Sequence, residues 1–223
     1  MGLRDLNLKN EYRSDKNNLV DEFFIPCLDT CTKFDRAVEF IQVTRFASYY
    51  FNNKNVKNRP TIRLVTGHRM STKNLNALVK IISQDRSKSL HAKIPFPLHS
   101  KLSQNEKPVQ DMLKTGKLRI KIAIPDSDEV YETFGEKIGI FRDDTDVVAF
   151  TGTSNRIFDP SHHDFESLDV FTSWDDKTRV QTKIDNFENL WANQTRYITV
   201  FDIVDAIEQN KLQYSQEWLT NNY

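Results

Sequence analysis

The sequence predicts an α/β fold in which a mixed sheet is flanked by helices on both faces. Two observations lead to this class. In the first half of the chain, short runs rich in β-branched and aromatic residues alternate with helical patterns, and further such runs then follow one another in the middle. The 38% of apolar residues, among them 15 Phe, suffice for a packed core, and we expect a single domain over residues 1–223.

The first half of the chain begins with a helical pattern. Apolar residues recur at helical spacing from Leu19 to Cys31, and Pro26 interrupts or kinks this helix. Ser71 or Thr72 can cap a later helix that carries a stripe of Leu, Val and Ile. Between these two helices we expect a strand at 34–41, a helix at 43–51 and a strand at 61–67.

The second half of the chain is richer in strands. Residues from about 84 to 108 are typical of a loop, because Pro95, Pro97 and Pro108 interrupt long regular elements. A helix with one apolar face follows residue 174, and a last helix is expected near 205–212. The expected strands share β-branched and aromatic residues and cover 118–124, 135–141, 147–152, 167–174 and 197–204.

Charge and hydropathy argue against several classes of protein. The 31 Lys and Arg balance 31 Asp and Glu, which argues against indiscriminate binding of nucleic acid; we interpret the basic runs 54–63 and 114–121 mainly as solvated faces. No run of about 18 apolar residues and no secretory signal is present, so we expect a cytoplasmic protein without a membrane partner. Cys27 and Cys31 lie in an apolar stretch without nearby His, which predicts buried thiols and no metal site.

The stretch from Phe134 to Asn155 is the strongest candidate for a functional site. It consists of two predicted strands, an acidic turn and a terminal loop of small residues. Lys137 supplies a cation, and the loop supplies neutral donors, for the oxygens of a phosphodiester; Gly152 lets the backbone approach a ligand closely. Alternation along the strand places positions 135, 137 and 139 on one face, so a side chain at 135 would stand beside Lys137, yet that residue is Gly135.

This stretch resembles the signature of the phospholipase D superfamily, which runs His-x-Lys, an acid, Gly-Ser-x-Asn and a Glu. The matching residues here are Gly135-Glu136-Lys137, Asp143, Gly152-Thr153-Ser154-Asn155 and Glu166. The chain also resembles the subset of these domains found with restriction endonucleases and superfamily-2 helicases. The segments that carry this second resemblance cover nearly the whole chain and are 12–28, 34–40, 137–141, 149–155, 165–174 and 187–191.

The resemblance implies a metal-independent phosphodiesterase that needs no cofactor, with a phospholipase D-like sheet. The motif His would attack phosphorus, and a second motif copy, often from a symmetry-related subunit, would protonate the leaving oxygen. Lys137 and Asn155 would bind the phosphate oxygens, together with the hydroxyls of Thr153 and Ser154. Glu166 would orient a motif His, whereas Asp143 is interpreted as structural, as is Arg36 within its apolar strand.

Three residues depart from the family pattern. Gly135 replaces the nucleophile, Thr153 replaces a Ser and keeps the hydroxyl, and Asp164 stands where an Asn often precedes the Glu. Because the Lys, Asn and Glu positions are retained, we favour a single substitution that disables a competent site over an old pseudoenzyme. A replacement nucleophile from His162 or His163 is less favoured, and His91-Ala92-Lys93 lacks the rest of the motif.

Three functions are therefore considered. The leading hypothesis is a homodimeric nuclease domain that acts on DNA in restriction or phage defence, is inactive as written, and works with a helicase, ATPase or specificity domain. The alternative is a non-catalytic DNA- or phosphate-binding scaffold module of a helicase–nuclease complex. A lipid head-group hydrolase is the weakest, since the sequence has no membrane segment and no second full motif.

Overall fold

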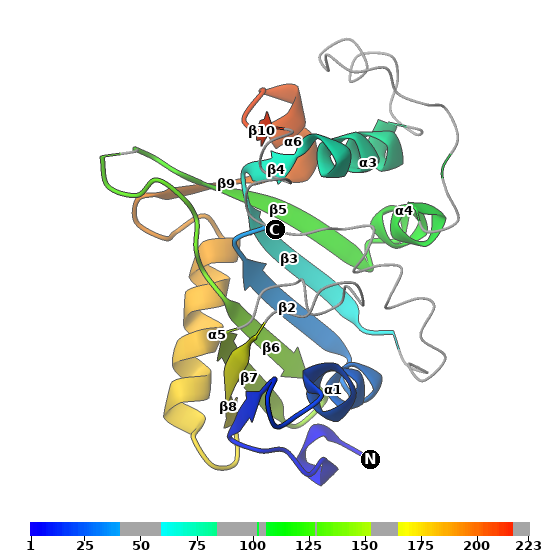
Figure 1. Ribbon diagram of the computed structural model, residues 1–223, viewed down its shortest axis with the longest axis vertical. Coiled ribbons are helices and arrows are strands. Elements are labelled where there is room, and N and C mark those ends of the chain that lie inside the picture. The colour runs from blue at the N-terminus through cyan, green and yellow to red at the C-terminus, as the bar shows by residue number, and fades with distance from the viewer. Residues whose placement is uncertain (41–58, 84–101, 103–105, 128, 153–164, 216–223) are drawn as a thin grey trace.

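The computed structural model describes residues 1–40, 59–83, 102, 106–127, 129–152 and 165–215, and its centre is an eight-stranded mixed sheet (Figure 1). Three strands in the sheet are parallel, and the strands on either side of them are antiparallel to their neighbours. In spatial order the strands are β1 (Glu11–Arg13), β8 (Ser167–Thr172), β7 (Val147–Gly152), β6 (Ile138–Arg142), β2 (Lys33–Val38), β3 (Thr61–Gly67), β5 (Leu118–Pro125) and β9 (Ile198–Asp202).

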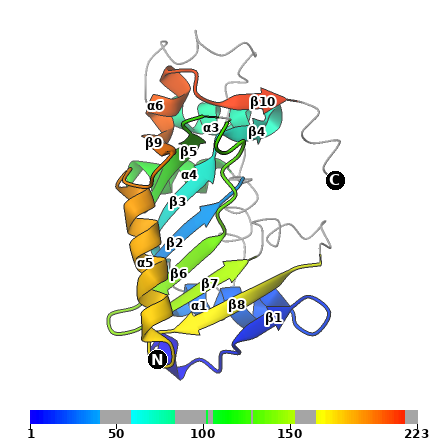
Figure 2. The same ribbon diagram turned by 90° about the vertical axis from the view of Figure 1, so that its left-hand side faces the viewer.

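Helices contribute apolar residues to both faces of this sheet. One buried cluster contains residues of η2 (Val20–Phe24), α1 (Ile25–Thr30), α3 (Thr72–Ser83), α4 (Glu106–Lys114) and α6 (Ile203–Glu208). The other cluster is formed under the long helix α5 (Lys177–Trp191), which runs along its own side of the sheet (Figure 2). A short helix η1 (Leu3–Asp5) precedes β1, and β4 (Arg69–Ser71) pairs in parallel with β10 (Gln213–Ser215). The predicted mixed α/β arrangement with helices on both faces is thus confirmed.

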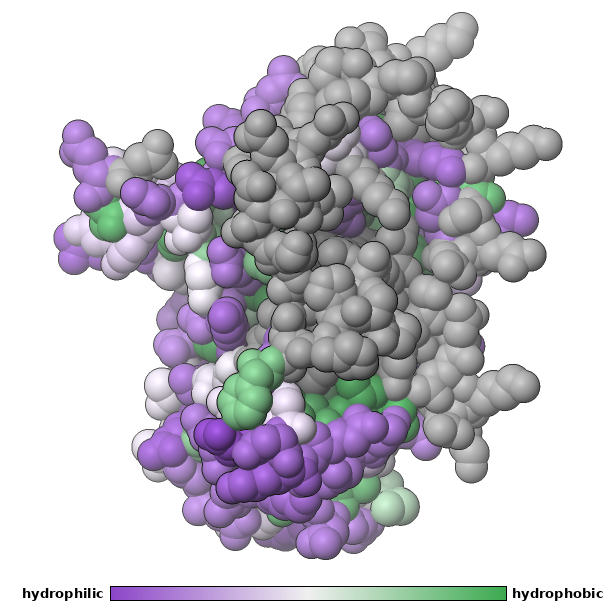
Figure 3. All heavy atoms as spheres, viewed as in Figure 1, coloured by the Kyte–Doolittle hydropathy of each residue, from purple (hydrophilic) through white to green (hydrophobic). Residues whose placement is uncertain are grey.

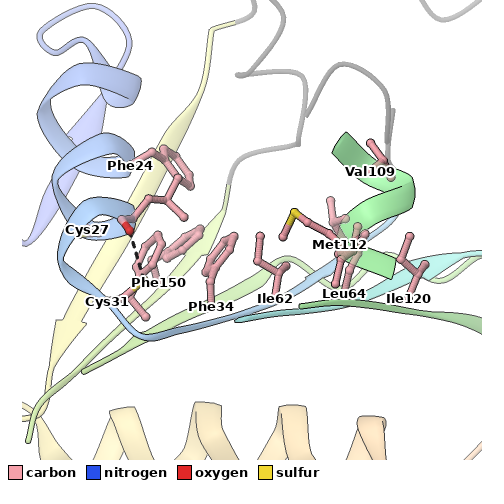
Figure 4. Close-up of a cluster of buried hydrophobic side chains, with 14 of the residues drawn as sticks. Phe24, Cys27, Cys31, Phe34, Ile62, Leu64, Val109, Met112, Ile120 and Phe150 are labelled. Atoms are coloured by element: carbon pink, nitrogen blue, oxygen red, sulfur yellow. Dashed lines mark hydrogen bonds between the residues drawn. The ribbon is translucent and has the colours of Figure 1, made fainter. Parts of the chain in front are cut away.

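The face toward α1 is called the aromatic face and is defined by Phe34, Phe141 and Phe150 (Figure 4). The rings of Phe34 and Phe141 are stacked with centroids 4.5 Å apart, and Phe141 lies 5.6 Å from Phe150. Cys27 and Cys31 of the α1 segment are fully buried, and burial raises the pKa of both thiols well above the ordinary range. They are packing residues, as predicted, because the reactive thiolate is disfavoured.

The face toward α5 is called the charged face, because an ion-pair network lies beneath that helix. The Asp35 carboxylate is 1% exposed and accepts two hydrogen bonds from Arg63, at 2.6 and 2.9 Å, and another from Arg142. Arg63 also donates to both Glu188 oxygens, at 3.0 and 2.6 Å, and these bonds lower the pKa of Glu188. Asp35 is the buried member of this network and is paired with two arginines, so its charge stays compensated within the fold.

Most predicted elements are confirmed within a few residues. The strands β2, β3, β5, β7 and β8 and the helices α3 and α5 lie where the patterns placed them. Of the two candidate caps for α3, Ser71 accepts the hydrogen bond, at 3.1 Å from the amide of Asn74. Pro26 does not end its helix, because it stands in the first turn of α1, directly after the π-helical turn η2. The helix expected at 43–51 lies outside the described residues.

Three predictions about the elements were wrong. Helix α4 begins at Glu106, inside the segment predicted to be a loop, and Pro108 is tolerated there because the first-turn amides have no intrahelical acceptor. Strand β6 begins at Ile138 and not at residue 135, and β9 ends at Asp202, where α6 begins. The short strands β1, β4 and β10 were not predicted.

Candidate functional site

The motif lysine lies where three segments of the chain meet. Lys137 directly precedes β6, and its carbonyl accepts a hydrogen bond of 3.1 Å from the amide of Gly152, the last residue of β7. Gly152 in turn pairs with Leu168 of β8. The predicted strand therefore starts too late to contain Lys137, but the β6–β7 register continues to it, so the start of the Gly-Thr-Ser-Asn loop lies beside the lysine.

Gly152 is needed for packing between strands. Its φ of +102° is in a region that other residues rarely adopt, and a Cβ there would lie 2.5 Å from the carbonyl oxygen of Ser167. The close approach expected at this glycine is thus made by the backbone of β8. The consequence for the site is that β7 and the residues before β8 are held tightly together.

Glu166 is fixed at this junction by the N-terminal segment. Its carbonyl accepts hydrogen bonds from the amide and hydroxyl of Ser14, at 2.9 and 3.0 Å, and its own amide lies 2.9 Å from the Ser14 hydroxyl oxygen. Strand β1 carries Ser14 to this place by pairing with β8, with Arg13 opposite Ser167. The backbone of Glu166 is therefore anchored near Gly152, where β7 ends and β8 begins.

Arg36, which the sequence predicts to be structural, lies within the apolar layer of β2. It is 2% exposed, and its guanidinium lies 4.9 Å from the centroid of the Phe150 ring. It pairs with Gly139 of β6. Any Cβ at residue 139 would come within 2.0 Å of the Phe150 ring, so only glycine leaves room for that ring. The alternation of the strands places Lys137 on the same face as Arg36.

The electrostatic setting of Arg36 connects it to the motif. Burial lowers the pKa of its guanidinium to about 10, while the nearby carboxylates of Glu166 and Glu136 act to raise it. Arg36 therefore carries its charge at neutral pH, close enough to Glu166 and Glu136 to interact with both carboxylates. A fixed cation near two motif positions suits a site in which negative charge is bound.

Position 135 is open. Gly135 is exposed, its φ is not among the positive values, and a Cβ built there meets nothing within 4 Å. A side chain at this position would therefore fit without backbone strain or a clash with the described residues. Gly135 is not demanded by packing, in contrast to Gly139 and Gly152.

Asp143 lies at the opposite end of β6 from Lys137. Its carboxylate accepts hydrogen bonds from the amides of Leu3, Asp146 and Thr145, at 2.6, 2.7 and 2.9 Å. Burial opposes ionisation, but the three amide donors outweigh it and lower the pKa of Asp143. The structural interpretation of Asp143 is confirmed.

The other candidate residues fall in one segment of the chain. Thr153, Ser154 and Asn155 lie outside the described residues, as do Asp164 and the candidate nucleophiles His162 and His163. Within the described ranges, no group of three His, Cys, Asp or Glu is arranged to hold a metal ion. The same part of the chain contains no helix long and apolar enough to cross a membrane.

No family model and no curated protein matches the chain. Among solved structures, it is similar to TrmBL2, described as an archaeal chromatin protein that shows a novel mode of DNA binding. The identity is 15%, the TM-score is 0.42, and the alignment covers 85% of this chain and 54% of that chain. The chain thus spans about half the length of TrmBL2. A structural similarity at this TM-score does not indicate the function of the chain.

Proposed function

We propose that the chain is a phosphodiester-cleaving domain of the phospholipase D type, built to act on DNA, whose nucleophile is missing. The observation that carries the proposal is position 135, which is open and unstrained beside Lys137. The pairing of Lys137 with Gly152 and the anchoring of Glu166 support the same arrangement of motif residues. The restriction or phage-defence context follows from the resemblance of the sequence alone.

In the proposed reaction, a histidine at position 135 attacks phosphorus. A phosphorus–nitrogen bond forms, the bond to the leaving oxygen breaks, and that oxygen takes a proton from a second histidine. Water then attacks the phosphohistidine and gives a proton to the second histidine, and the phosphorus–nitrogen bond breaks to release the product and the first histidine. Lys137 and Asn155 stabilise the charge on the phosphoryl oxygens, and Arg36 adds a fixed positive potential beneath them.

The second histidine requires a second copy of the motif. Since one full motif is present in the sequence, we propose a homodimer whose two-fold axis brings two copies together. Light scattering at micromolar concentration is then expected to give twice 26.1 kDa. A strictly monomeric particle would contradict the two-motif reaction and favour a binding module.

The test is cleavage in EDTA by Gly135→His, with Gly135→Ala as the matched control. We expect Gly135→His to cleave single-stranded or duplex DNA and a nitrophenyl phosphodiester. The unaltered chain and Gly135→Ala are expected to be inactive, because loss of a nucleophile that acts with its neighbours costs several orders of magnitude. Equal cleavage by the unaltered chain would contradict the proposal and direct attention to His162 and His163. An inert but folded Gly135→His would contradict it as well.

Gly135 itself favours a second candidate function, a non-catalytic DNA-binding scaffold that works beside a helicase or ATPase. Such a module would keep the cations and dispense with the nucleophile. It predicts binding of DNA by the unaltered chain and no cleavage by Gly135→His. The cleavage assay therefore separates the two candidates.

A further inference from the structure

A groove of about 590 Å³ lies beside Gly135, between residues 131–136, the C-terminal end of α5 and the start of β9. Its volume is within the range of about 300–1,000 Å³ that is usual for small-ligand sites. Three side-chain amides line it, those of Asn186, Asn189 and Gln194, together with Phe134 and the carboxylate-bearing Glu136. The groove therefore begins at the open position of the candidate site.

One exposed tyrosine lines this groove, and a second packs against the first. Tyr131, which lines it, is 50% exposed, and Tyr197 is 37% exposed; their rings meet edge to face with centroids 6.3 Å apart. The segments that carry them project side by side beyond the end of α5 (Figure 1), and the projection has a mainly hydrophilic surface (Figure 3). The guanidinium of Arg196 lies 4.3 Å from the ring centroid of Tyr197.

Tyr197 is held in a strained backbone conformation. Its φ is +66°, a region in which a bulky residue is a genuine outlier. The strand junction fixes this conformation, because the carbonyl of Tyr197 accepts a hydrogen bond of 3.0 Å from the amide of Asp126. Strain of this kind is concentrated at functional sites, and here it keeps an aromatic ring exposed against Tyr131, which lines the groove.

The chemistry of the groove defines its ligand. Neutral amides and a carboxylate can pair with the donors and acceptors on the edge of a nucleobase, and exposed aromatic rings offer surfaces on which bases stack. Glu136 disfavours a phosphate beside it, whereas Arg196, which also lines the groove, is a cation suited to a flanking phosphate. A base in the groove would thus leave its phosphate next to position 135.

We propose that the groove binds an unpaired base of single-stranded DNA and so directs the adjoining phosphodiester to the candidate site. This inference rests on the proposed function for its choice of substrate. Bases within a duplex are stacked and paired, so they offer no free face to the tyrosines and no free Watson–Crick edge to the amides. The preference for a single strand follows from this difference.

The experiment measures the affinity of the unaltered chain for a fluorescent oligo(dT) and for a duplex hairpin of equal length, by anisotropy. We expect tighter binding of the single strand and a loss of about 5- to 150-fold for Tyr131→Ala and for Tyr197→Gly, as for removal of one stacking partner. Tyr197→Gly is also expected to raise the melting temperature, because glycine adopts the positive φ without strain. Weaker binding by a more stable protein cannot result from misfolding.

Arg196→Ala has a matched control in Arg179→Ala. Both arginines are exposed and lie over an aromatic ring, but Arg179 is in the first turn of α5, away from the groove. We expect weaker oligonucleotide binding only for Arg196→Ala. Equal effects of the two substitutions, or equal affinity of the chain for duplex and single strand, would overturn the proposal.

A second readout separates this proposal from the proposed function. In the Gly135→His background, cleavage of a nitrophenyl phosphodiester, which has no base, is expected to be unchanged by Tyr131→Ala, while cleavage of the oligonucleotide falls. If Gly135→His cleaves the ester and the tyrosine substitutions leave oligonucleotide binding intact, the groove proposal alone fails. If Gly135→His cleaves nothing while oligo(dT) binding depends on the tyrosines, the groove proposal stands and the catalytic one fails.

Discussion

The two ends of β6 adjoin two residues of the proposed motif in opposite settings. At one end, Asp143 has its carboxylate occupied by three backbone amides that hold the β6–β7 turn and the N-terminal helix. At the other end, Lys137 is exposed, and its ammonium group has no hydrogen-bond or ion-pair partner among the described residues. The difference shows that sequence proximity within a motif does not imply a shared role, because one group is satisfied by the fold and the other remains available for a ligand.

The glycines at the lysine end repeat this contrast. A Cβ at Gly139 or Gly152 would collide with the Phe150 ring or with the β8 backbone, whereas a Cβ at Gly135 meets nothing. The first two glycines are therefore requirements of the fold. Gly135 is the one of the three at which a side chain can be added without a structural cost, so a histidine can be placed there to test the proposed activity.

Of the substitutions that test the difference between the two ends of β6, Lys137→Ala in a Gly135→His background is expected to have the largest effect on activity. Loss of a donor to the transition-state oxygens lowers kcat by about 10²–10³-fold. The melting temperature is expected to stay unchanged, because the lysine side chain makes no hydrogen bond or ion pair within the described part of the chain. If Lys137→Ala instead lowers the melting temperature strongly and leaves the activity per folded molecule unchanged, Lys137 is a structural residue.

The opposite pattern is expected for Asp143→Ala. Its three amide donors would lose a charged acceptor, which costs about 1–3 kcal/mol in the free energy of unfolding. Activity per folded molecule of the Gly135→His enzyme should be retained, as measured by initial rates after correction for the folded fraction. A loss of kcat at full stability would show that both ends of β6 serve the reaction.

A smaller effect on stability is expected from a change of pH, through the ionisation of Asp143. The pKa of Asp143 is lowered in the folded state, so its contribution to stability is present above the ordinary aspartate pKa of about 3.9 and is lost as pH falls below it. Chemical denaturation between about pH 5 and about pH 2 should therefore show a shallower loss of stability for Asp143→Ala than for the unaltered chain. Parallel curves would contradict the assigned role.

The sequence was informative where local patterns decide structure. The run 61–67 is strongly β-prone and forms β3 with the predicted bounds, and the serine cap of α3 was among the two candidates. Helix α4 was missed because Pro108 was interpreted as a breaker, although a first-turn proline is compatible with a helix. Whether the proline breaks the helix therefore depends on its position within the helix.

The candidate site was predictable only in part. The two strands joined by an acidic turn were predicted, and their pairing, which follows from a short turn, brings Lys137 beside Gly152. The placement of Arg36 depends on β2 lying next to β6, which is distant in sequence and has no local signal. The strain at Tyr197 likewise arises from a tertiary hydrogen bond to Asp126, and no propensity scale indicates it.

The most direct test of the central claim uses the unaltered chain with free imidazole. If position 135 is an open nucleophile site beside working phosphate ligands, imidazole can enter it, attack a nitrophenyl phosphodiester and release nitrophenolate, which needs no protonation by a second histidine. In EDTA, we predict cleavage that rises with imidazole concentration and is lost in Lys137→Ala. A rate that is the same with the unaltered chain, with Lys137→Ala and with imidazole alone would contradict the account.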